Sequence, residues 1–168
     1  MNTGECDLLK ILNQGLIPSY YVASESNCRK SLKAYVSDYL IQEVFQEGLT
    51  RNIQAFSRFF DALAYCQGEL INFANFASDC GVDAKTVQEY FHILEDTLVG
   101  TMVYPYSKRN SREIITHMPK FFLFDVGVGG HIARRVIREE KGEQFCRAMK
   151  HFIFMELQAY KQYREKDF

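Results

Sequence analysis

A glycine-rich turn is the first place in this chain where phosphate or dinucleotide binding would be sought. Gly127, Gly129 and Gly130 follow a short apolar run, but the third glycine of a GxGxxG loop would fall on Ile132. The chain also has no GxxxxGK[ST] run, the phosphate loop of many nucleotide-binding proteins. The pattern therefore favours a plain turn from a strand into a helix, with no cofactor.

Metal and thiol chemistry are not indicated either. No two histidines lie four residues apart, and none lies beside a cysteine at ligand spacing; they are His92, His117, His131 and His151. The five cysteines are scattered without a CxxC pair, which is typical of reduced thiols in a cytoplasmic protein. We expect no metal site and no catalytic residue.

Two adjacent acids, Glu95 and Asp96, resemble a catalytic pair only at first sight. Neighbouring residues on a helix point about 100° apart, so the two carboxylates do not face a common substrate. They also lie near the predicted C-terminus of a helix, where the helix dipole disfavours acids. We expect a base or a backbone amide to offset them and the pair to fix the corner after the helix.

The overall composition excludes several classes of protein. Apolar residues make up 47% and charged residues 24%, which is the balance of a globular protein rather than a disordered one. Lys and Arg number 20 against 21 Asp and Glu, so the chain is not a globally basic nucleic-acid binder. No apolar run approaches the ~18 residues of a membrane span, and the N-terminus is no secretory signal. We expect a cytoplasmic protein with no membrane partner.

Apolar residues at spacings of three and four predict long helices. The first half is expected to hold a short helix over 7–13, irregular chain over 15–26, and two helices over 27–47 and 51–67. Asn27 is the predicted cap of the second helix. Because the linker between the last two is short, we expect them to pack as an antiparallel helical hairpin.

The middle of the chain has the pattern of a winged helix-turn-helix. Asn72 and Asp83 are predicted to cap two helices separated by a tight turn at Cys80 and Gly81. Strand-forming residues follow over 98–106, a basic tip over 107–112, a return strand over 114–116 and a buried strand opened by Pro119. Two further helices are expected over 128–139, capped by Asp125, and over 143–163.

The predicted fold class is therefore mostly α. It contains a winged helix-turn-helix with a small β-hairpin, packed on a helical hairpin, and a long C-terminal helix. The predicted domains are 1–68 for the N-terminal segment and hairpin, 69–124 for the winged helix-turn-helix, and 125–168 for the C-terminal helices.

Charge separates two uses of the helix-turn-helix. Its second helix, over 83–96, carries four acids against one lysine, which opposes docking into a phosphate-walled major groove. The wing carries four basic residues against one acid; the candidate nucleic-acid contacts are Lys108, Arg109, Arg112 and Lys120. The charge pattern favours a protein partner, with DNA binding through the basic wing as the alternative. Basic hairpin tips can also merely protect a sheet edge.

Several motifs together resemble a known family. They are GLIP at 15–18, YVSDYL at 35–40, FSRF at 56–59, INFANFASDCGVDAKTVQEYFHILEDTLVG at 71–100 and PKFFLFDVGV at 119–128. In combination they resemble the C-terminal domain, of unknown function, of a large prokaryotic family of AAA-type ATPases, from about Leu12 to Phe168.

The resemblance implies an ATPase module, a winged-helix region and, in many members, a nuclease-like region of the PD-(D/E)XK kind. By this resemblance, the chain is expected to lack the ATPase module and to reach only the opening helix of the nuclease-like region. Glu156 and Leu157 match the Glu-Leu pair of that helix in the family. Lys150 stands where the family usually has an acid, which argues against nuclease chemistry. The implied role is a non-catalytic regulatory or interaction domain whose partner is an ATPase module or another protein.

The predicted C-terminal helix carries large apolar side chains that need a partner. The candidate interface residues, predicted to share one face, are Phe145, Met149, Phe152, Ile153, Leu157 and Tyr160. The helix can fold back onto the helical hairpin or pair with a second copy, and we expect a homodimer.

Overall fold

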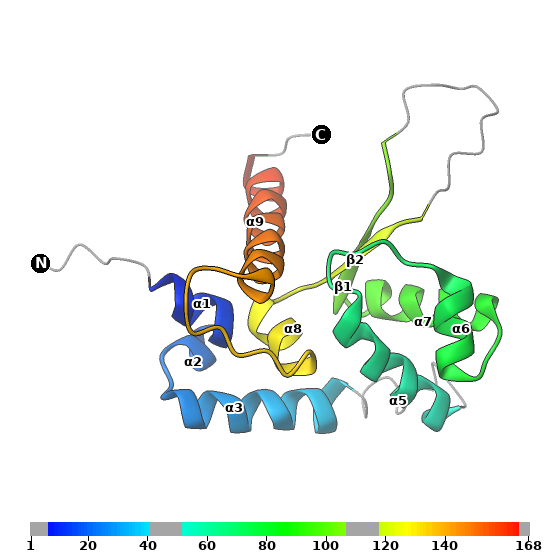
Figure 1. Ribbon diagram of the computed structural model, residues 1–168, viewed down its shortest axis with the longest axis horizontal. Helices are drawn as coiled ribbons and strands as arrows, with labels where there is room; N and C mark the ends of the chain where they lie inside the picture. The colour runs from blue at the N-terminus through cyan, green and yellow to red at the C-terminus, as the bar shows by residue number, and fades with distance from the viewer. Residues whose placement is uncertain (1–6, 41–51, 107–117, 165–168) are drawn as a thin grey trace, which may run out of the picture. The chain divides into compact units, whose positions relative to one another are not determined.

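The chain divides into two units, which Figure 1 shows as a ribbon. The computed structural model describes residues 7–40, 52–106 and 118–164. The first unit comprises residues 1–42 and 124–168, and the second comprises residues 43–123. This grouping differs from the three consecutive segments expected from the sequence, because residues from both ends of the chain build the first unit.

The first unit is helical throughout its described elements. They are α1 (Leu8–Gln14), α2 (Pro18–Tyr21), α3 (Glu25–Ala34), the π-helix η1 (Tyr35–Leu40), α8 (Val126–Ile132) and α9 (Glu143–Arg164). Helix α8 packs against α1, α3 and α9, and in Figure 1 it lies between them. The unit is therefore held together around α8, the short helix that contains Gly127, Gly129 and Gly130, where the sequence had suggested a turn before a helix.

A buried carboxylate joins the end of α1 to the start of α8. Asp125 Oδ1 accepts hydrogen bonds from the amides of Gly127 (2.8 Å) and Val128 (3.0 Å), and its Oδ2 accepts one from Leu16 (2.8 Å). The predicted cap at Asp125 is thus confirmed. Burial raises the pKa of this carboxyl, and the three amides oppose that shift. One side chain caps α8 and fixes the turn after α1.

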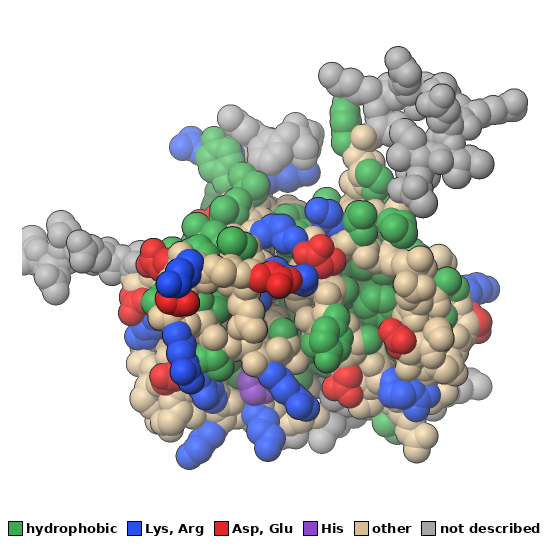
Figure 2. Space-filling view, viewed as in Figure 1, with side chains coloured by type: hydrophobic (Ala, Val, Ile, Leu, Met, Phe, Trp, Pro, Cys, Tyr) green, Lys and Arg blue, Asp and Glu red, His purple; other side chains and the backbone are tan. Residues whose placement is uncertain are grey.

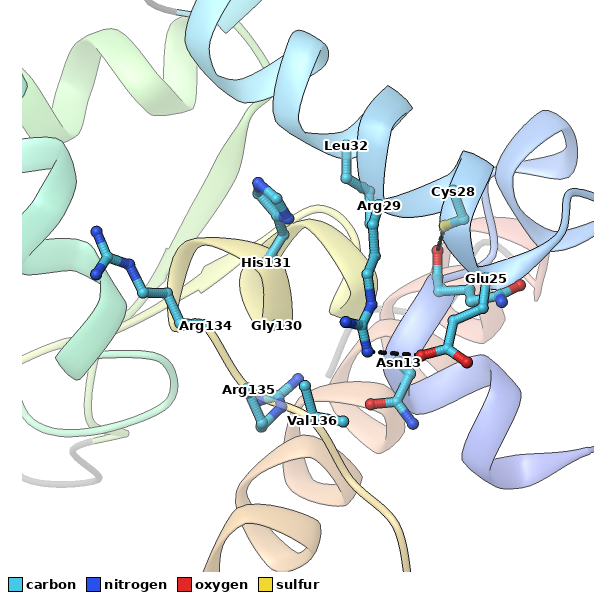
Figure 3. A pocket seen from close by; sticks show the side chains of 11 residues that line it. Asn13, Glu25, Cys28, Arg29, Leu32, Gly130, His131, Arg134, Arg135 and Val136 are labelled. Atoms are coloured by element: carbon cyan, nitrogen blue, oxygen red, sulfur yellow. Dashed lines mark hydrogen bonds and ion pairs between the residues drawn. The ribbon is translucent and has the colours of Figure 1, made fainter.

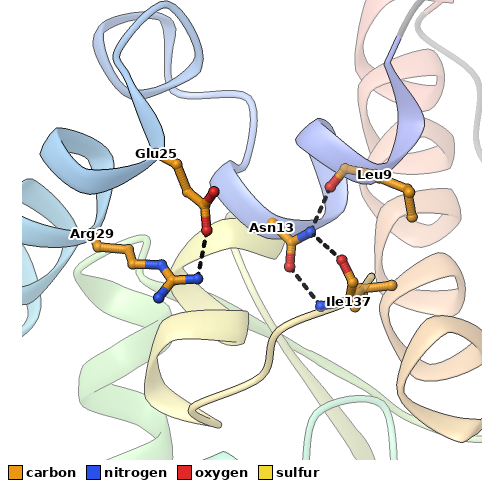
Figure 4. Close-up of polar contacts among 5 residues, drawn as sticks. All are labelled: Leu9, Asn13, Glu25, Arg29 and Ile137. Atoms are coloured by element: carbon orange, nitrogen blue, oxygen red, sulfur yellow. Dashed lines mark hydrogen bonds and ion pairs between the residues drawn. The ribbon is translucent and has the colours of Figure 1, made fainter. Parts of the chain in front are cut away.

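A second polar contact closes the same unit further along the chain. Asn13 Oδ1 accepts from the amide of Ile137 (2.8 Å), and its Nδ2 donates to the carbonyl oxygens of Ile137 and Leu9, each at 2.8 Å (Figure 4). The segment after α8 is therefore tied to α1 through a side-chain amide whose oxygen and nitrogen are both bonded.

The core of the first unit gathers side chains from α1, α8 and α9. Its buried members are Ile11, Leu12, Val126, Ile137 and Ala148, with Phe145, Phe152 and Met155 of α9 packed against it. In α9, Ala148 and His151 are fully buried. The N-terminal half of this 22-residue helix thus belongs to the core.

The second unit is a helix-turn-helix preceded by a third helix and followed by a two-stranded sheet. Its elements are α5 (Ile53–Ala62), the 3-10 helix η2 (Leu63–Tyr65), α6 (Phe73–Cys80), α7 (Ala84–Asp96), β1 (Gly100–Val103) and β2 (Lys120–Leu123). Aromatic rings fill the core. Phe91 of α7 lies 4.9 Å from Phe59 and 5.1 Å from Phe121 between ring centroids, so one ring connects α5, α7 and β2.

The sheet is antiparallel, with Gly100 paired to Leu123 and Val103 to Lys120. The other edge of β2 contacts the segment before α6, because Gly68 donates to Phe121 O (2.9 Å) and Ile71 donates to Pro119 O (2.8 Å). The strand is therefore held on both edges, by β1 and by the chain that leads into the helix-turn-helix.

The mostly helical fold with a small antiparallel sheet is confirmed. Asn72 and Asp83 cap α6 and α7 as predicted, and Gly81 ends α6 in the left-handed conformation (φ +67°). The two helices of the expected hairpin, however, fall in different units, and residues 41–51 between them lie outside the described residues. Helix α5 packs on α6 and α7, because its buried phenylalanines meet the rings of α7.

Three predicted helix boundaries were wrong. Ser24 rather than Asn27 caps α3, since its hydroxyl accepts from the amide of Asn27. A short helix, α2, occupies part of the stretch expected to be irregular, with Pro18 at its first position. Helix α8 spans Val126–Ile132 instead of 128–139, because Arg134 adopts a positive φ of 50° and turns the chain away.

Candidate functional site

The second helix of the helix-turn-helix, α7, exposes polar and acidic side chains on its outer face. Glu89 and Asp96 are exposed on this face, and Lys85 is the only exposed lysine or arginine within the described helix. Asp83, at the helix start, accepts from the amide (2.8 Å) and the hydroxyl (3.0 Å) of Thr86, and these bonds lower the pKa of its carboxyl. The surface that would face a DNA groove is therefore negative, as the sequence indicated.

Glu95 has a structural partner. Its Oε1 accepts a hydrogen bond of 2.8 Å from the amide of Met102 in β1, and its Oε2 lies 3.6 Å from His92 Nδ1. The expectation that a backbone amide offsets this acid is met, and the carboxylate ties the end of α7 to the sheet. Asp96 is exposed to solvent and does not take part in this link between α7 and the sheet.

Most of the predicted basic wing lies outside the described residues. Lys108, Arg109 and Arg112 fall in the stretch 107–117, as does the predicted return strand over 114–116. Lys120 begins β2, where it pairs with Val103 and is half-buried. Lys120 is therefore the candidate nucleic-acid contact whose position in the sheet is described.

The apolar residues of α9 divide between two sides of the helix. Phe145 and Phe152 pack on the core of the first unit, whereas Ile153, Leu157 and Tyr160 remain 46%, 52% and 45% exposed. Met149 is half-buried. At 100° per residue the six predicted residues lie within one arc of roughly 140°, so these two sides are the covered edge and the exposed edge of a single broad face. Figure 2 shows hydrophobic side chains gathered over α9. We call Ile153, Leu157 and Tyr160 the α9 stripe.

A pocket of about 270 Å³ lies within the first unit, between α1, α3 and the end of α8 (Figure 3). Its charged lining residues are Glu25, Arg29, Arg134 and Arg135. Arg29 Nη2 lies 2.6 Å from Glu25 Oε1, an ion pair that Figure 4 also shows. The pocket therefore carries an excess of positive charge.

Two other pocket residues have shifted pKa values. Burial, with the nearby charge of Lys33, lowers the pKa of His131, so its imidazole is neutral at pH 7. Burial raises the pKa of the Cys28 thiol, which lies 3.9 Å from the carbonyl oxygen of Gln14, so Cys28 is not an activated nucleophile.

The sequence analysis missed this pocket. Arg29 precedes Arg134 and Arg135 by over 100 positions in the chain, and only the packing of α3 on α8 brings these residues together. The sequence signal that could have indicated a basic pocket was the adjacent pair Arg134 and Arg135, shortly after the glycine-rich segment.

Within the ranges that the structure describes, no group of three or more His, Cys, Asp or Glu side chains is arranged to hold a metal ion. No helix among the described residues is long and apolar enough to cross a membrane.

The chain is a mostly helical protein of two units. One unit contains the helix-turn-helix and the two-stranded sheet, and the other is helical. The family model described as "Domain of unknown function (DUF8612)" matches residues 6–137, and the chain belongs to that family. The match includes the whole second unit and the first unit up to the segment after α8; it ends before α9. Among curated proteins and solved structures, none matches this chain.

Proposed function

We propose that this chain is a non-catalytic protein-interaction domain that pairs with a second copy through the α9 stripe. In an AAA-type ATPase protein, the family that its motifs resemble, such a domain would regulate or assemble the ATPase module. The winged-helix motifs over 71–100 and 119–128 support this relationship. The observation that carries the interaction role is the row of exposed apolar side chains on α9.

The α9 stripe is large enough for a weak dimer. Its three side chains are each about half exposed, so complete burial of one adds roughly 0.75–1.5 kcal/mol, half of the value for a fully exposed side chain. Six such side chains in two copies contribute roughly 5–9 kcal/mol before the costs of association. With association costs at their low end, about 4 kcal/mol, at most about 5 kcal/mol remains, so we expect a dissociation constant of about 0.2 mM or weaker.

Charges beside the stripe suit a parallel pairing of two α9 helices. Glu156 and Lys161 flank the stripe on opposite sides, five residues apart. In a parallel two-stranded helical pair, residues at this spacing meet across the interface, so Glu156 of one copy would face Lys161 of the other. A two-fold axis would repeat this contact, which makes the surface self-complementary.

Association can be measured by sedimentation velocity from about 20 μM to 1 mM, a range that brackets the expected dissociation constant. Leu157→Asp should abolish the dimer, whereas Val22→Asp, which changes a 78% exposed apolar residue at the C-cap of α2, should leave it unchanged. Glu156→Lys should weaken association several-fold, and the double exchange Glu156→Lys with Lys161→Glu should restore it. A monomer at every concentration, or a dimer that tolerates Leu157→Asp, would contradict the proposal.

The DNA-binding alternative predicts a different result. A salt-dependent gel shift of duplex DNA would compare the wild type with the variant in which Lys108, Arg109 and Arg112 are alanine. The acidic outer face of α7 supports the expectation of no shift at low salt. A steep salt dependence that flattens in the triple variant would establish DNA binding through the wing.

The non-catalytic role is tested with the pure chain, ATP and a divalent metal ion. We expect neither ATP hydrolysis nor DNA cleavage, because the sequence has no phosphate loop and no acidic ligand motif. Either activity, if a substitution in this chain abolished it, would refute the proposal.

A further inference from the structure

The pocket of the first unit is lined by a half-buried cation, Arg135, that no described carboxylate neutralises. Arg135 Nη2 donates a hydrogen bond of 3.2 Å to the carbonyl oxygen of Val126. Its Nε is buried and has no hydrogen-bond partner among the described residues. Burial lowers the pKa of Arg135 to about 10, so the guanidinium remains charged at neutral pH.

A charge in this position is unfavourable in the folded protein unless something compensates it. Removing a guanidinium from water costs several kcal/mol, and proteins usually repay that cost with a carboxylate or with full hydrogen bonding. Arg135 has one carbonyl acceptor for its five N–H groups within the described residues. An anion in the adjacent pocket would supply both the charge and the missing acceptors.

The surrounding groups suit an anion as well. In Figure 3, Arg29 reaches down from α3 and Arg135 lies on the other side of the pocket, below Gly130. His131 is neutral and can donate one hydrogen bond. Glu25 is the one acid of the lining, and it is already paired with Arg29.

The backbone at the end of α8 holds Arg135 in place. Arg134 donates its amide to His131 O (3.0 Å) and Arg135 donates its amide to Gly130 O (2.8 Å), the pair of bonds of a Schellman motif. Glycine normally occupies the left-handed position of that motif, but this chain has Arg134 there, with φ +50°. Arg134 lines the pocket although its backbone conformation would favour glycine. This choice of residue is consistent with a need for positive charge in the pocket.

Gly130 makes room for the guanidinium. A Cβ at this position would lie 3.1 Å from Arg135 Nη2, closer than ordinary van der Waals contact. An alanine at this position would require the guanidinium to shift by a few tenths of an ångström, and larger side chains would displace it further.

We propose that this pocket binds a small phosphate-type oxyanion, with Arg135 and Arg29 as its principal ligands. The size of the pocket favours this class over a larger molecule. About 270 Å³ lies below the roughly 300–1,000 Å³ that encloses a drug-sized ligand, but it accommodates an orthophosphate or diphosphate group. The tetrahedral oxyanion offers acceptors in several directions, which matches guanidinium groups arriving from two walls.

Binding is tested on the full chain with orthophosphate and diphosphate, with chloride at the same ionic strength as the control. Isothermal titration calorimetry gives the affinity, and the Arg135 Nε–H signal in NMR spectra reports contact at the buried group. We expect saturable binding, a shift of that signal, and a rise in Tm of roughly 3–6 °C at ten times the Kd.

Three variants test the role of the named residues. Arg135→Met should weaken binding at least tenfold without lowering the Tm of the anion-free protein, because it removes a half-buried charge whose buried Nε has no described partner. Arg134→Gly should weaken binding while raising that Tm, since glycine relieves the positive φ. The matched control, Lys30→Gln, removes an exposed positive charge from α3 that lines neither this pocket nor the hollow beside it and should leave binding unchanged.

Two outcomes would overturn the proposal. One is the absence of saturable binding at 10 mM phosphate or diphosphate, together with an unmoved Arg135 Nε–H signal. The other is an equal loss of affinity in Arg135→Met and Lys30→Gln, since that result would mean attraction by net charge rather than by this pocket.

Discussion

Replacing Gly127 by alanine tests how α1 and α8 are joined. A Cβ on Gly127 would lie 2.4 Å from the carbonyl carbon of Gln14 and 2.4 Å from the amide nitrogen of Gly15. Both atoms belong to the backbone at the end of α1, so no side-chain rotation can relieve the contact. The two helices would have to move apart by about 1 Å to reach ordinary van der Waals distance.

The expected magnitude follows from two opposing effects. Alanine in a helix is favoured over glycine by roughly 0.5–1 kcal/mol, so propensity alone predicts stabilisation. Separation of α1 from α8 instead strains the Asp125 bond to Leu16 and loosens the packing of Leu12 on Val126. Overpacking of this kind costs roughly 1–3 kcal/mol, and each lost hydrogen bond to a carboxylate adds about 1.5–3. We expect a net destabilisation of about 2–4 kcal/mol.

Gly130→Ala is the matched control, because it makes the same change in the same helix. Its Cβ would meet only the end of a long side chain, Arg135 Nη2 at 3.1 Å, so the expected change in stability is below about 1 kcal/mol. The free energy of unfolding is measured by urea titration with circular dichroism at 222 nm. If Gly127→Ala proved as stable as Gly130→Ala, the close backbone contact between α1 and α8 would be refuted.

Three further predictions concern single side chains. Tyr90→Phe should leave stability unchanged or raise it by up to about 1 kcal/mol in thermal unfolding, because the buried Tyr90 hydroxyl has no hydrogen-bond partner among the described residues; a loss above that size would contradict this. Glu95→Ala should cost about 1–3 kcal/mol and Glu95→Gln clearly less, because only glutamine keeps an acceptor for the Met102 amide; equal losses in urea unfolding would argue against that bond. His131 has a lowered pKa in the folded state, so the unfolded chain takes up its proton first as the pH falls below about 6.5, and stability falls with it. His131→Gln should remove that part of the pH dependence between pH 7.5 and 5.5, and an unchanged profile in Tm measurements would disprove the assignment.

The helix-turn-helix was predictable because its signals are local. Asn72 and Asp83 each precede a helix by one residue, and both side chains accept from amides in the first turn. The aromatic spacing of α7 placed Tyr90 and Phe91 on its buried side, as the structure has them. Capping and periodicity depend on residues within one or two turns, so the sequence alone contains that information.

The features that the sequence analysis missed depend on distant parts of the chain. Helix α8 ends at Ile132 although Val136 and Ile137 continue its apolar spacing. The reason is that Arg134 adopts the left-handed conformation, which a glycine at this position would have made predictable. Ile137 then packs in the core from outside a helix, held by Asn13. The two sides of α9 were likewise indistinguishable without knowing where the core lies.

The contact between Asn13 and Ile137 gives a physical reason for the extent of the family match. The second unit is continuous in sequence, from 43 to 123, and its insertion separates the two parts of the first unit. Those parts must be held together by contacts between α1 and the segments around α8, namely the bonds of Asp125 to Leu16 and of Asn13 to Ile137. The match, 6–137, begins just before the first of these elements and ends at Ile137, the residue that Asn13 holds. Helix α9 packs on the resulting core but lies beyond the match, so the matched range contains the contacts that close the first unit and not the α9 stripe.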